Sequence, residues 1–146
     1  PLKSRPSGPI DVRLRVPQGS GLPLTDMVRL EPGGELPQPV LYRRGPTTGN
    51  RVQAAGEASF SRTERARFDL PASAGVTITS ARILDRNAAP VDLPLTLADW
   101  QDPDGQRWIS TEIVLAPLGA GDYVVEFSGT TPTGAQQVLT AFRVTR

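Results

Sequence analysis

Three aspartates fall within six positions of one short polar segment, at Asp99, Asp102 and Asp104. Oxygen-rich loops of this density can bind Ca²⁺. The run Asp102-Pro103-Asp104-Gly105 also has the sequence of a hairpin turn, because Pro presets φ and Gly accepts the left-handed conformation. The spacing of an EF-hand is not met, since no Glu follows at the required distance. The segment therefore predicts a turn, with calcium near Asp102 and Asp104 as the alternative.

A second polar segment, Arg43–Asn50, has the glycines and hydroxyls of a phosphate-binding loop. It lacks the Gly-Lys-Ser/Thr ending, and no helix is expected after it to supply an N-terminal dipole. This segment predicts a surface loop. The aromatic residues Tyr42, Trp100 and Trp108 could form a platform for sugar stacking, although a Trp in a β-sandwich normally belongs to the core.

The chain contains no His and no Cys. This composition excludes a His general base, a Cys nucleophile, disulfides, and zinc sites built on imidazole or thiolate. The 15 acidic residues are scattered over turns and outward strand positions, and no pair of them is forced together in a cleft. We therefore expect no enzymatic activity, no cofactor and no metal ligands.

The overall charge is +1, which argues against nucleic-acid binding through bulk charge. In the run Arg62–Asp69 the acids interleave with the bases, as on a solvated strand face. No apolar stretch approaches the roughly 18 residues of a membrane span, so no membrane insertion is expected. The chain begins at Pro1 rather than Met, which suggests a processed product or a fragment.

Strand-like alternation dominates the sequence, and Pro and Gly punctuate it as in all-β proteins. A short turn near Leu97–Trp100 is the only helical candidate. A bulge is expected near Thr79-Ser80, where the apolar phase of one strand changes. Six strands are expected between residues 62 and 146, at Glu64–Leu70, Val76–Asp85, Val91–Leu97, Arg107–Ala116, Gly121–Gly129 and Ala135–Thr145. We expect their apolar faces to share one core formed by Phe68, Ile83, Leu95, Ile113, Tyr123, Val125 and Phe142.

A structural corner is predicted at Leu118, Gly121 and Tyr123. A Leu-x-x-Gly-x-Tyr turn entering a strand is typical of the tyrosine corner of an immunoglobulin-like sandwich. Gly suits the chain reversal, and the Tyr hydroxyl can return to a backbone group. The predicted fold class is therefore all-β: an immunoglobulin-like or fibronectin III-like antiparallel β-sandwich with an extended N-terminal segment.

An immunoglobulin-like sandwich usually has at least seven strands, so the six strands expected after residue 62 leave one strand to be supplied from elsewhere. The best candidate is Ile10–Val16, in which Ile10, Val12, Leu14 and Val16 lie on one face. This strand could pack on its own domain or complete the sheet of a partner. We expect two regions: residues 1–61, an N-terminal arm with short strands packing on a sandwich, and residues 62–146, the sandwich itself.

Several runs resemble a known family: Val40–Asn50, Phe60–Arg65, Leu118–Tyr123 and Ala141–Val144. They are similar to the β-rich region after the von Willebrand factor A domain in secreted bacterial proteins, notably the acidobacterial von Willebrand factor A-related group. The resemblance covers about two-thirds of the chain and implies export, a multidomain parent and a non-catalytic accessory role. The metal-site motif Asp-x-Ser-x-Ser is absent, so the family's adhesion chemistry cannot be carried over to any residue here.

These observations favour a non-catalytic extracellular or cell-surface β-sandwich module with a structural or adhesive role. Its expected partners are proteins, either further copies of itself in a homo-oligomer or other domains of a parent protein. Two alternatives remain open. One is a self-assembling subunit of an extracellular filament, joined by strand donation through the N-terminal arm. The other is a carbohydrate-binding module that uses the two Trp residues.

Overall fold

The computed structural model describes residues 10–16, 19, 24–30, 36–72 and 74–146. The chain divides into two compact units, Pro1–Gly34 and Glu35–Arg146. Strands form nearly all of the regular structure, and the one helical turn among the described residues is the 3₁₀ helix η1, Pro46–Thr48. The predicted all-β class is confirmed.

The N-terminal unit contains an antiparallel pair of strands, β1 (Ile10–Val16) and β2 (Leu24–Leu30). Asp11, Arg13 and Arg15 are exposed, as the alternation of the sequence predicts. The side chains of Ile10, Val12, Leu14 and Val16 lie outside the described part of the chain. The expected strand at Ile10–Val16 is therefore present, and it pairs with β2 of the same chain.

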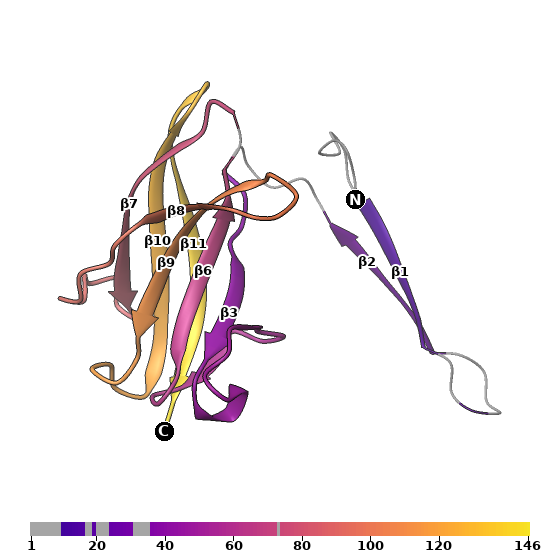
Figure 1. Ribbon diagram of the computed structural model, residues 1–146, viewed down its shortest axis with the longest axis horizontal. Helices are drawn as coiled ribbons and strands as arrows, with labels where there is room; N and C mark the ends of the chain where they lie inside the picture. Colours follow the sequence, from indigo (N-terminus) through magenta and orange to yellow (C-terminus); the bar gives the residue numbers. More distant parts are fainter. Residues whose placement is uncertain (1–9, 17–18, 20–23, 31–35, 73) are drawn as a thin grey trace. The chain divides into compact units, whose positions relative to one another are not determined.

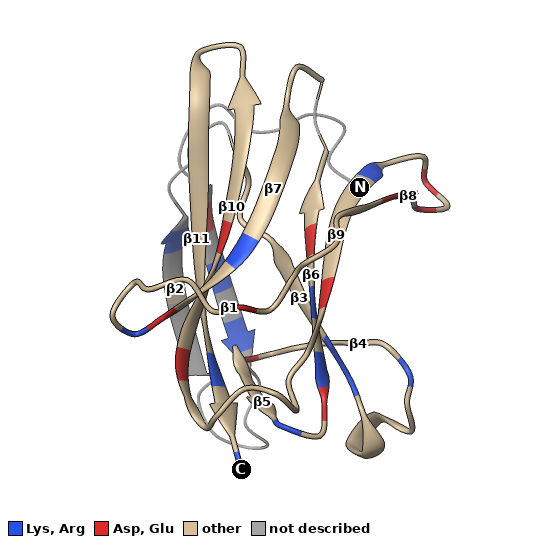
Figure 2. Ribbon diagram, turned by 90° about the vertical axis from the view of Figure 1, so that its left-hand side faces the viewer, with Lys and Arg blue, Asp and Glu red and all other residues tan. Residues whose placement is uncertain are grey.

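The second unit is a sandwich of two sheets, which lie one behind the other in Figure 1 and side by side in Figure 2. One sheet has the order β5-β11-β10-β7, and the other has the order β4-β3-β6-β9-β8. All neighbouring strands are antiparallel except β5 and β11, which are parallel. The strands of the first sheet are β5 (Ser59–Ser61), β11 (Gly134–Thr145), β10 (Gly121–Thr131) and β7 (Thr77–Asp85). Those of the second are β4 (Gln53–Ala54), β3 (Val40–Arg44), β6 (Arg65–Pro71), β9 (Arg107–Val114) and β8 (Ala98–Gln101).

Aromatic rings from both sheets meet in the core. The Phe68 ring on β6 lies 5.6 Å from the ring of Phe142 and 6.5 Å from that of Phe127, measured between centroids. Five of the seven predicted core residues are buried, and the other two, Leu95 and Tyr123, are half-buried and pack against the cluster. The core prediction therefore holds, apart from the complete burial expected of Leu95 and Tyr123.

The expected strand Val91–Leu97 is wrong. This segment crosses from β7 to β8 without joining either sheet as a strand, and only its start is bonded to β7, where Val91 N–H donates to the Ile83 carbonyl. Pro90 and Pro94 have no N–H to donate, which limits sheet pairing. The alternation still has a physical meaning, because Val91, Leu93, Leu95 and Leu97 all pack against the core. The strand that does pair is β8, where the sequence indicated a helical turn.

The expected bulge in β7 is confirmed. Ser80 pairs with Ser128 and Ile78 pairs with Gly129, which leaves Thr79 as the extra residue. The partner strand needs glycine here, because a Cβ at Gly129 would lie only 2.6 Å from the Thr77 carbonyl oxygen. The change of apolar phase in the sequence thus marks a real change of register.

The predicted region boundary at residues 61 and 62 requires correction. β3 and β4 belong to one sheet of the sandwich, and β5 belongs to the other. The sandwich unit therefore begins at Glu35. The seventh strand sought in Ile10–Val16 is β3, which pairs with β6 along its whole length. The sequence indicates a short strand at Pro39–Arg43, which Pro39 limits to an edge or a strand start, and β3 confirms that a strand lies there.

We predict that Phe68→Ala lowers the free energy of unfolding by about 3–5 kcal/mol, because it removes a fully buried ring between the sheets. Leu95→Ala should cost less, since Leu95 is half-buried on the crossover. Urea denaturation of both variants provides the measurement. An equal loss for the two variants would contradict this description of the core.

Candidate functional site

The most distinctive side-chain cluster lies on the outer face of the five-stranded sheet. Trp100 on β8 and Trp108 on β9 are direct cross-strand partners, and their rings stack with centroids 6.0 Å apart and planes 15° apart. The guanidinium carbon of Arg67 lies 5.0 Å from the centroid of the Trp100 ring. Trp100 is half-buried, and its Nε1 is buried without a hydrogen-bond partner among the described residues. The pair is thus neither an ordinary core element nor an open platform.

A buried carboxylate lies beside this cluster. Asp69 on β6 is only 1% exposed, although it lies in the row of side chains that contains Arg67. Arg67 Nε donates to Asp69 Oδ1 over 2.7 Å. Burial raises the pKa of Asp69, and the bond and charge of Arg67 oppose that shift in part. Arg67 therefore links a buried acid to a Trp ring, as is common for guanidinium groups.

The aspartate-rich segment is the turn between β8 and β9. Gly105 has φ +83°, the left-handed conformation expected there, and its N–H donates to the Asp102 carbonyl over 3.0 Å. Asp102 Oδ1 accepts the N–H groups of Asp104 and Gln106, and Asp102 Oδ2 accepts Trp108 Nε1–H over 3.0 Å. Both carboxylate oxygens of Asp102, one of the two residues considered for calcium, are therefore bonded within the turn and to Trp108. No group of three or more acidic side chains in the described part of the chain is arranged to hold a metal ion.

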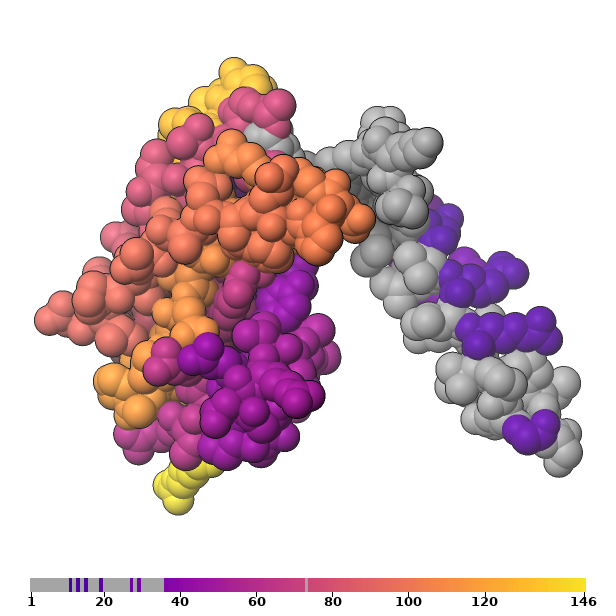
Figure 3. Space-filling view, in the orientation of Figure 1, coloured from indigo at the N-terminus to yellow at the C-terminus, as the bar shows by residue number. Residues whose placement is uncertain are grey.

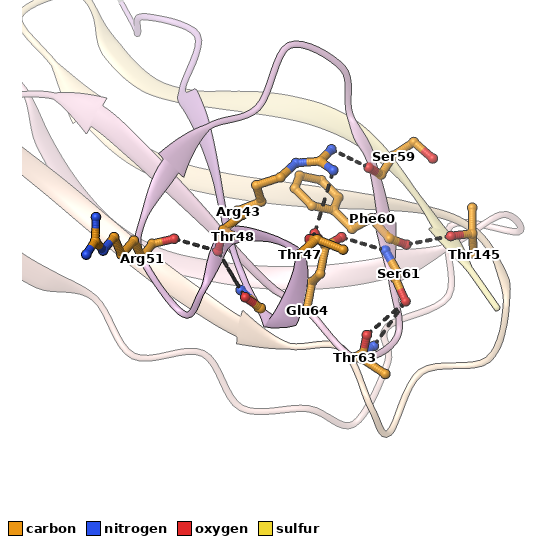
Figure 4. Close-up of polar contacts among 11 residues, drawn as sticks. Arg43, Thr47, Thr48, Arg51, Ser59, Phe60, Ser61, Thr63, Glu64 and Thr145 are labelled. Carbon is orange, nitrogen blue, oxygen red and sulfur yellow. Dashed lines mark hydrogen bonds and ion pairs between the residues drawn. The ribbon is translucent and has the colours of Figure 1, made fainter.

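In the loop considered for phosphate binding, the polar groups of Arg43, Thr47 and Thr48 bond other groups of the protein, as Figure 4 shows. Arg43 donates to the Ser59 carbonyl over 2.7 Å, lies 3.6 Å from Glu64 and sits over the Phe60 ring. Thr47 donates to Glu64 Oε1, and the Thr48 hydroxyl bonds backbone groups of its own turn. Glu64, 3% exposed, also accepts the N–H of Ser61 over 2.8 Å. This network joins β3 of one sheet to β5 of the other.

The structural corner forms as the sequence predicts. Tyr123 donates its hydroxyl to the Gly119 carbonyl over 3.0 Å, and its ring stacks on Phe142 at 5.6 Å. Leu118 is buried and closes a turn through its N–H bond to the Leu115 carbonyl. Gly121 lies beside the Tyr ring, where an added Cβ would make ordinary contact at 3.9 Å. The one correction is that Tyr123 is half-buried.

The sequence-based candidates therefore come together only in part. Trp100, Trp108 and Asp102 form one cluster, whereas Tyr42 lies on β3, on the other side of β6 from the two Trp strands. Sequence reasoning missed Arg67 with Asp69, and it also missed Arg43 with Glu64. Both pairs contain a charged residue that is buried, and the alternation of polar and apolar residues does not reveal which charged residues are buried.

In the described part of the chain, no helix is long and apolar enough to cross a membrane.

The chain matches no protein-family model. The searches of curated proteins and of solved structures find no significant similarity either.

We predict that Tyr123→Phe lowers the free energy of unfolding by about 0.5–1.5 kcal/mol, the usual net value of one hydrogen bond. The lower end applies because the bond to Gly119 is solvent-exposed, so water can satisfy the carbonyl in the variant. Chemical denaturation provides the measurement. An unchanged midpoint would show that the hydroxyl contributes nothing to the corner.

We also predict opposite pH effects from two aspartates. The bond from Trp108, followed by backbone bonds, lowers the pKa of Asp102. Its contribution to stability is therefore present above the ordinary Asp pKa of about 3.9 and is lost as the pH falls through the folded-state value. Asp69 has a raised pKa, so its contribution declines as the pH rises from the ordinary value through the folded-state value.

Carboxyl-carbon NMR titration measures both pKa values directly. Trp108→Phe removes the indole donor and should move the pKa of Asp102 upward toward its ordinary value. An Asp102 pKa that is the same in the variant and the parent would contradict the role assigned to Trp108.

Proposed function

We propose that this chain is a non-catalytic immunoglobulin-like β-sandwich module with a structural or adhesive role in a secreted or cell-surface protein. The strand order supports the immunoglobulin-like assignment. Constant-type immunoglobulin domains have sheets A-B-E-D and C-F-G. The orders β3-β6-β9-β8 and β7-β10-β11 follow the same sequence of strands. The Tyr123 corner at the start of β10 supports the assignment as well, since β10 takes the position of strand F.

The charged groups support a non-catalytic role. In the described part of the chain four carboxylates have shifted pKa values, and each is hydrogen-bonded to neighbouring groups of the protein. Asp85 accepts the N–H groups of Asn87 and Ala89, and Asp122 pairs with Arg143. Asp69 pairs with Arg67, and Asp102 holds its turn. Carboxylates that are bonded in this way hold turns and strands in place, which is consistent with a structural role for these residues.

The parallel pairing of β5 with β11 is the observation that carries the structural role. Tension from the N-terminal side first meets β3 and β4, and once they detach it reaches β5 from its N-terminal end, while β11 is loaded from its C-terminal end. Because the strands are parallel, these forces act at opposite ends of the pair and load its hydrogen bonds in shear, all at once. These bonds include Arg143 N–H to the Ala58 carbonyl, at 2.8 Å, and Arg62 N–H to the Thr145 carbonyl, at 3.1 Å.

The alternatives receive less support. Strand donation was motivated by a missing strand, and β3 fills that position. A sugar platform was motivated by the Trp pair, and its rings already contact each other and Arg67. The proposed extracellular location rests on the sequence resemblance.

We predict that Arg143→Pro lowers the force needed to unfold the full chain when it is pulled from both ends in a single-molecule experiment. Proline removes the N–H that bonds Ala58 and takes no N–H donor from the pairing with β10, because that N–H faces β5. Arg143→Ala is the matched control, since it loses the ion pair with Asp122 but keeps the N–H. Equal unfolding forces for the two variants would contradict the mechanical role proposed for β5 and β11.

A further inference from the structure

Two arginines lie directly opposite each other on the outer face of the five-stranded sheet. Arg44, the last residue of β3, pairs in register with Arg65, the first residue of β6. Both side chains lie on the outer face, because Leu41 and Ala66, which have the opposite phase on these strands, pack in the core. Like charges in directly opposed positions destabilise a strand pair. Natural proteins break such local rules mainly at functional positions.

Neighbouring acids compensate the charge of Arg65 but not that of Arg44. Arg65 Nη1 lies 2.8 Å from Glu112 Oε1. Glu64, which precedes Arg65 in the chain, is buried with Arg43 at 3.6 Å. Arg44 is half-buried, and its side chain makes no ion pair or hydrogen bond with any residue that the structure describes. Because a guanidinium has five N–H donors, Arg44 offers unused donors to an anion from solvent.

The residues beside this arginine pair suit a sugar ring as well as an anion. Tyr42 lies on the same face of β3 as Arg44, is half-buried, and has a hydroxyl that no described residue bonds. Val114, opposite Arg65 on β9, is 43% exposed. A free phenol and an open aliphatic surface therefore flank the two cations. In Figure 3 the purple surface of β3 and the loop after it is open at the lower front of the sandwich.

We propose that Arg44 and Arg65 bind the carboxylate or sulfate groups of an acidic polysaccharide. A guanidinium can donate two parallel N–H groups to one such group, and an anion between the two arginines removes their mutual repulsion. The site is separate from the Trp pair, whose rings already contact each other. This inference rests on the proposed function, because it gives the adhesive role a ligand.

The place of the pair in the sheet favours a polysaccharide over an acidic peptide or a membrane. An extended peptide gains affinity by adding a strand to a free sheet edge. β6 is paired on both sides, and β3 has β6 on one side and β4 on the other. Side chains alone must therefore recognise the ligand, as they can with charged groups on a sugar chain. Basic clusters that bind membranes contain about four to eight Lys or Arg residues, more than this pair supplies.

Binding of the full chain to soluble polysaccharides tests the ligand class. The probes are polygalacturonate, which carries carboxylates, dextran sulfate, which carries sulfates, and neutral dextran, measured by calorimetry at low salt. The chain should bind at least one acidic probe and not neutral dextran, and added salt should weaken the binding. No binding to either acidic probe, or equal binding to neutral dextran, would overturn the proposal. Binding of poly-glutamate as tightly as the acidic polysaccharides would overturn the choice of a polysaccharide.

Substitutions of single arginines test the site. Arg44→Gln and Arg65→Gln should each weaken binding about tenfold, the lower end for hydrogen bonds to a charged group. Arg86→Gln is the matched control, because Arg86 is an exposed arginine in the turn after β7 of the other sheet. It changes the net charge equally and should leave the affinity unchanged. Equal losses for Arg44→Gln and Arg86→Gln would overturn the assignment of the site.

The denaturation midpoint of Arg44→Gln separates loss of binding from loss of the fold. It should equal or exceed that of the parent chain, because the side chain of Arg44 makes no bond with any described residue and its removal relieves the repulsion with Arg65. A lower midpoint would contradict the description of Arg44 as an unused cation. Failure of this proposal is distinguishable from failure of the structural role, because pulling on Arg143→Pro probes a different strand pair.

Discussion

The contact between Phe68 and the rings of Phe127 and Phe142 is the interaction on which the sandwich depends. Phe68 lies on the middle strand of one sheet, and the other two rings lie on adjacent strands of the opposite sheet. The chain has no cysteine, so no disulfide joins the sheets. Apolar burial must therefore hold the layers together. The Arg43–Glu64 network and the Tyr123 corner lie at the periphery of this core. They fix the ends of strands whose middle parts pack through the core.

Much of the fold could be predicted because alternation reports burial directly. It identified the strands that became β6, β7, β9, β10 and β11, and it located the bulge at Thr79. It failed at the crossover, where four alternating apolar residues are half-buried without belonging to a strand. Alternation records which side chains face the core, whereas sheet membership also needs backbone donors. Pro90 and Pro94 cannot supply those donors.

The side-chain clusters were harder to predict than the strands. The turn at Asp102 and the corner at Tyr123 were predictable, because local sequence specifies both. The pair Arg67–Asp69 was not, because its significance depends on Trp100, which reaches β6 only across β9. Arg43 was hidden for a similar reason. The sequence places it at the start of a polar loop, and only the pairing of β3 with β6 turns it toward Phe60 and Glu64.

Cross-strand ion pairs on the outer face of the four-stranded sheet also indicate which residues of neighbouring strands lie opposite each other. Arg82 lies directly opposite Glu126, and Asp122 lies directly opposite Arg143. The second of these pairs is exposed on both sides and contributes little to stability by itself. A slip of one residue would nevertheless separate both pairs and would also turn the apolar faces of β10 toward solvent. The ion pairs and the apolar alternation therefore favour the same strand register. The charged residues contribute to the choice of that register more than to the stability of the fold.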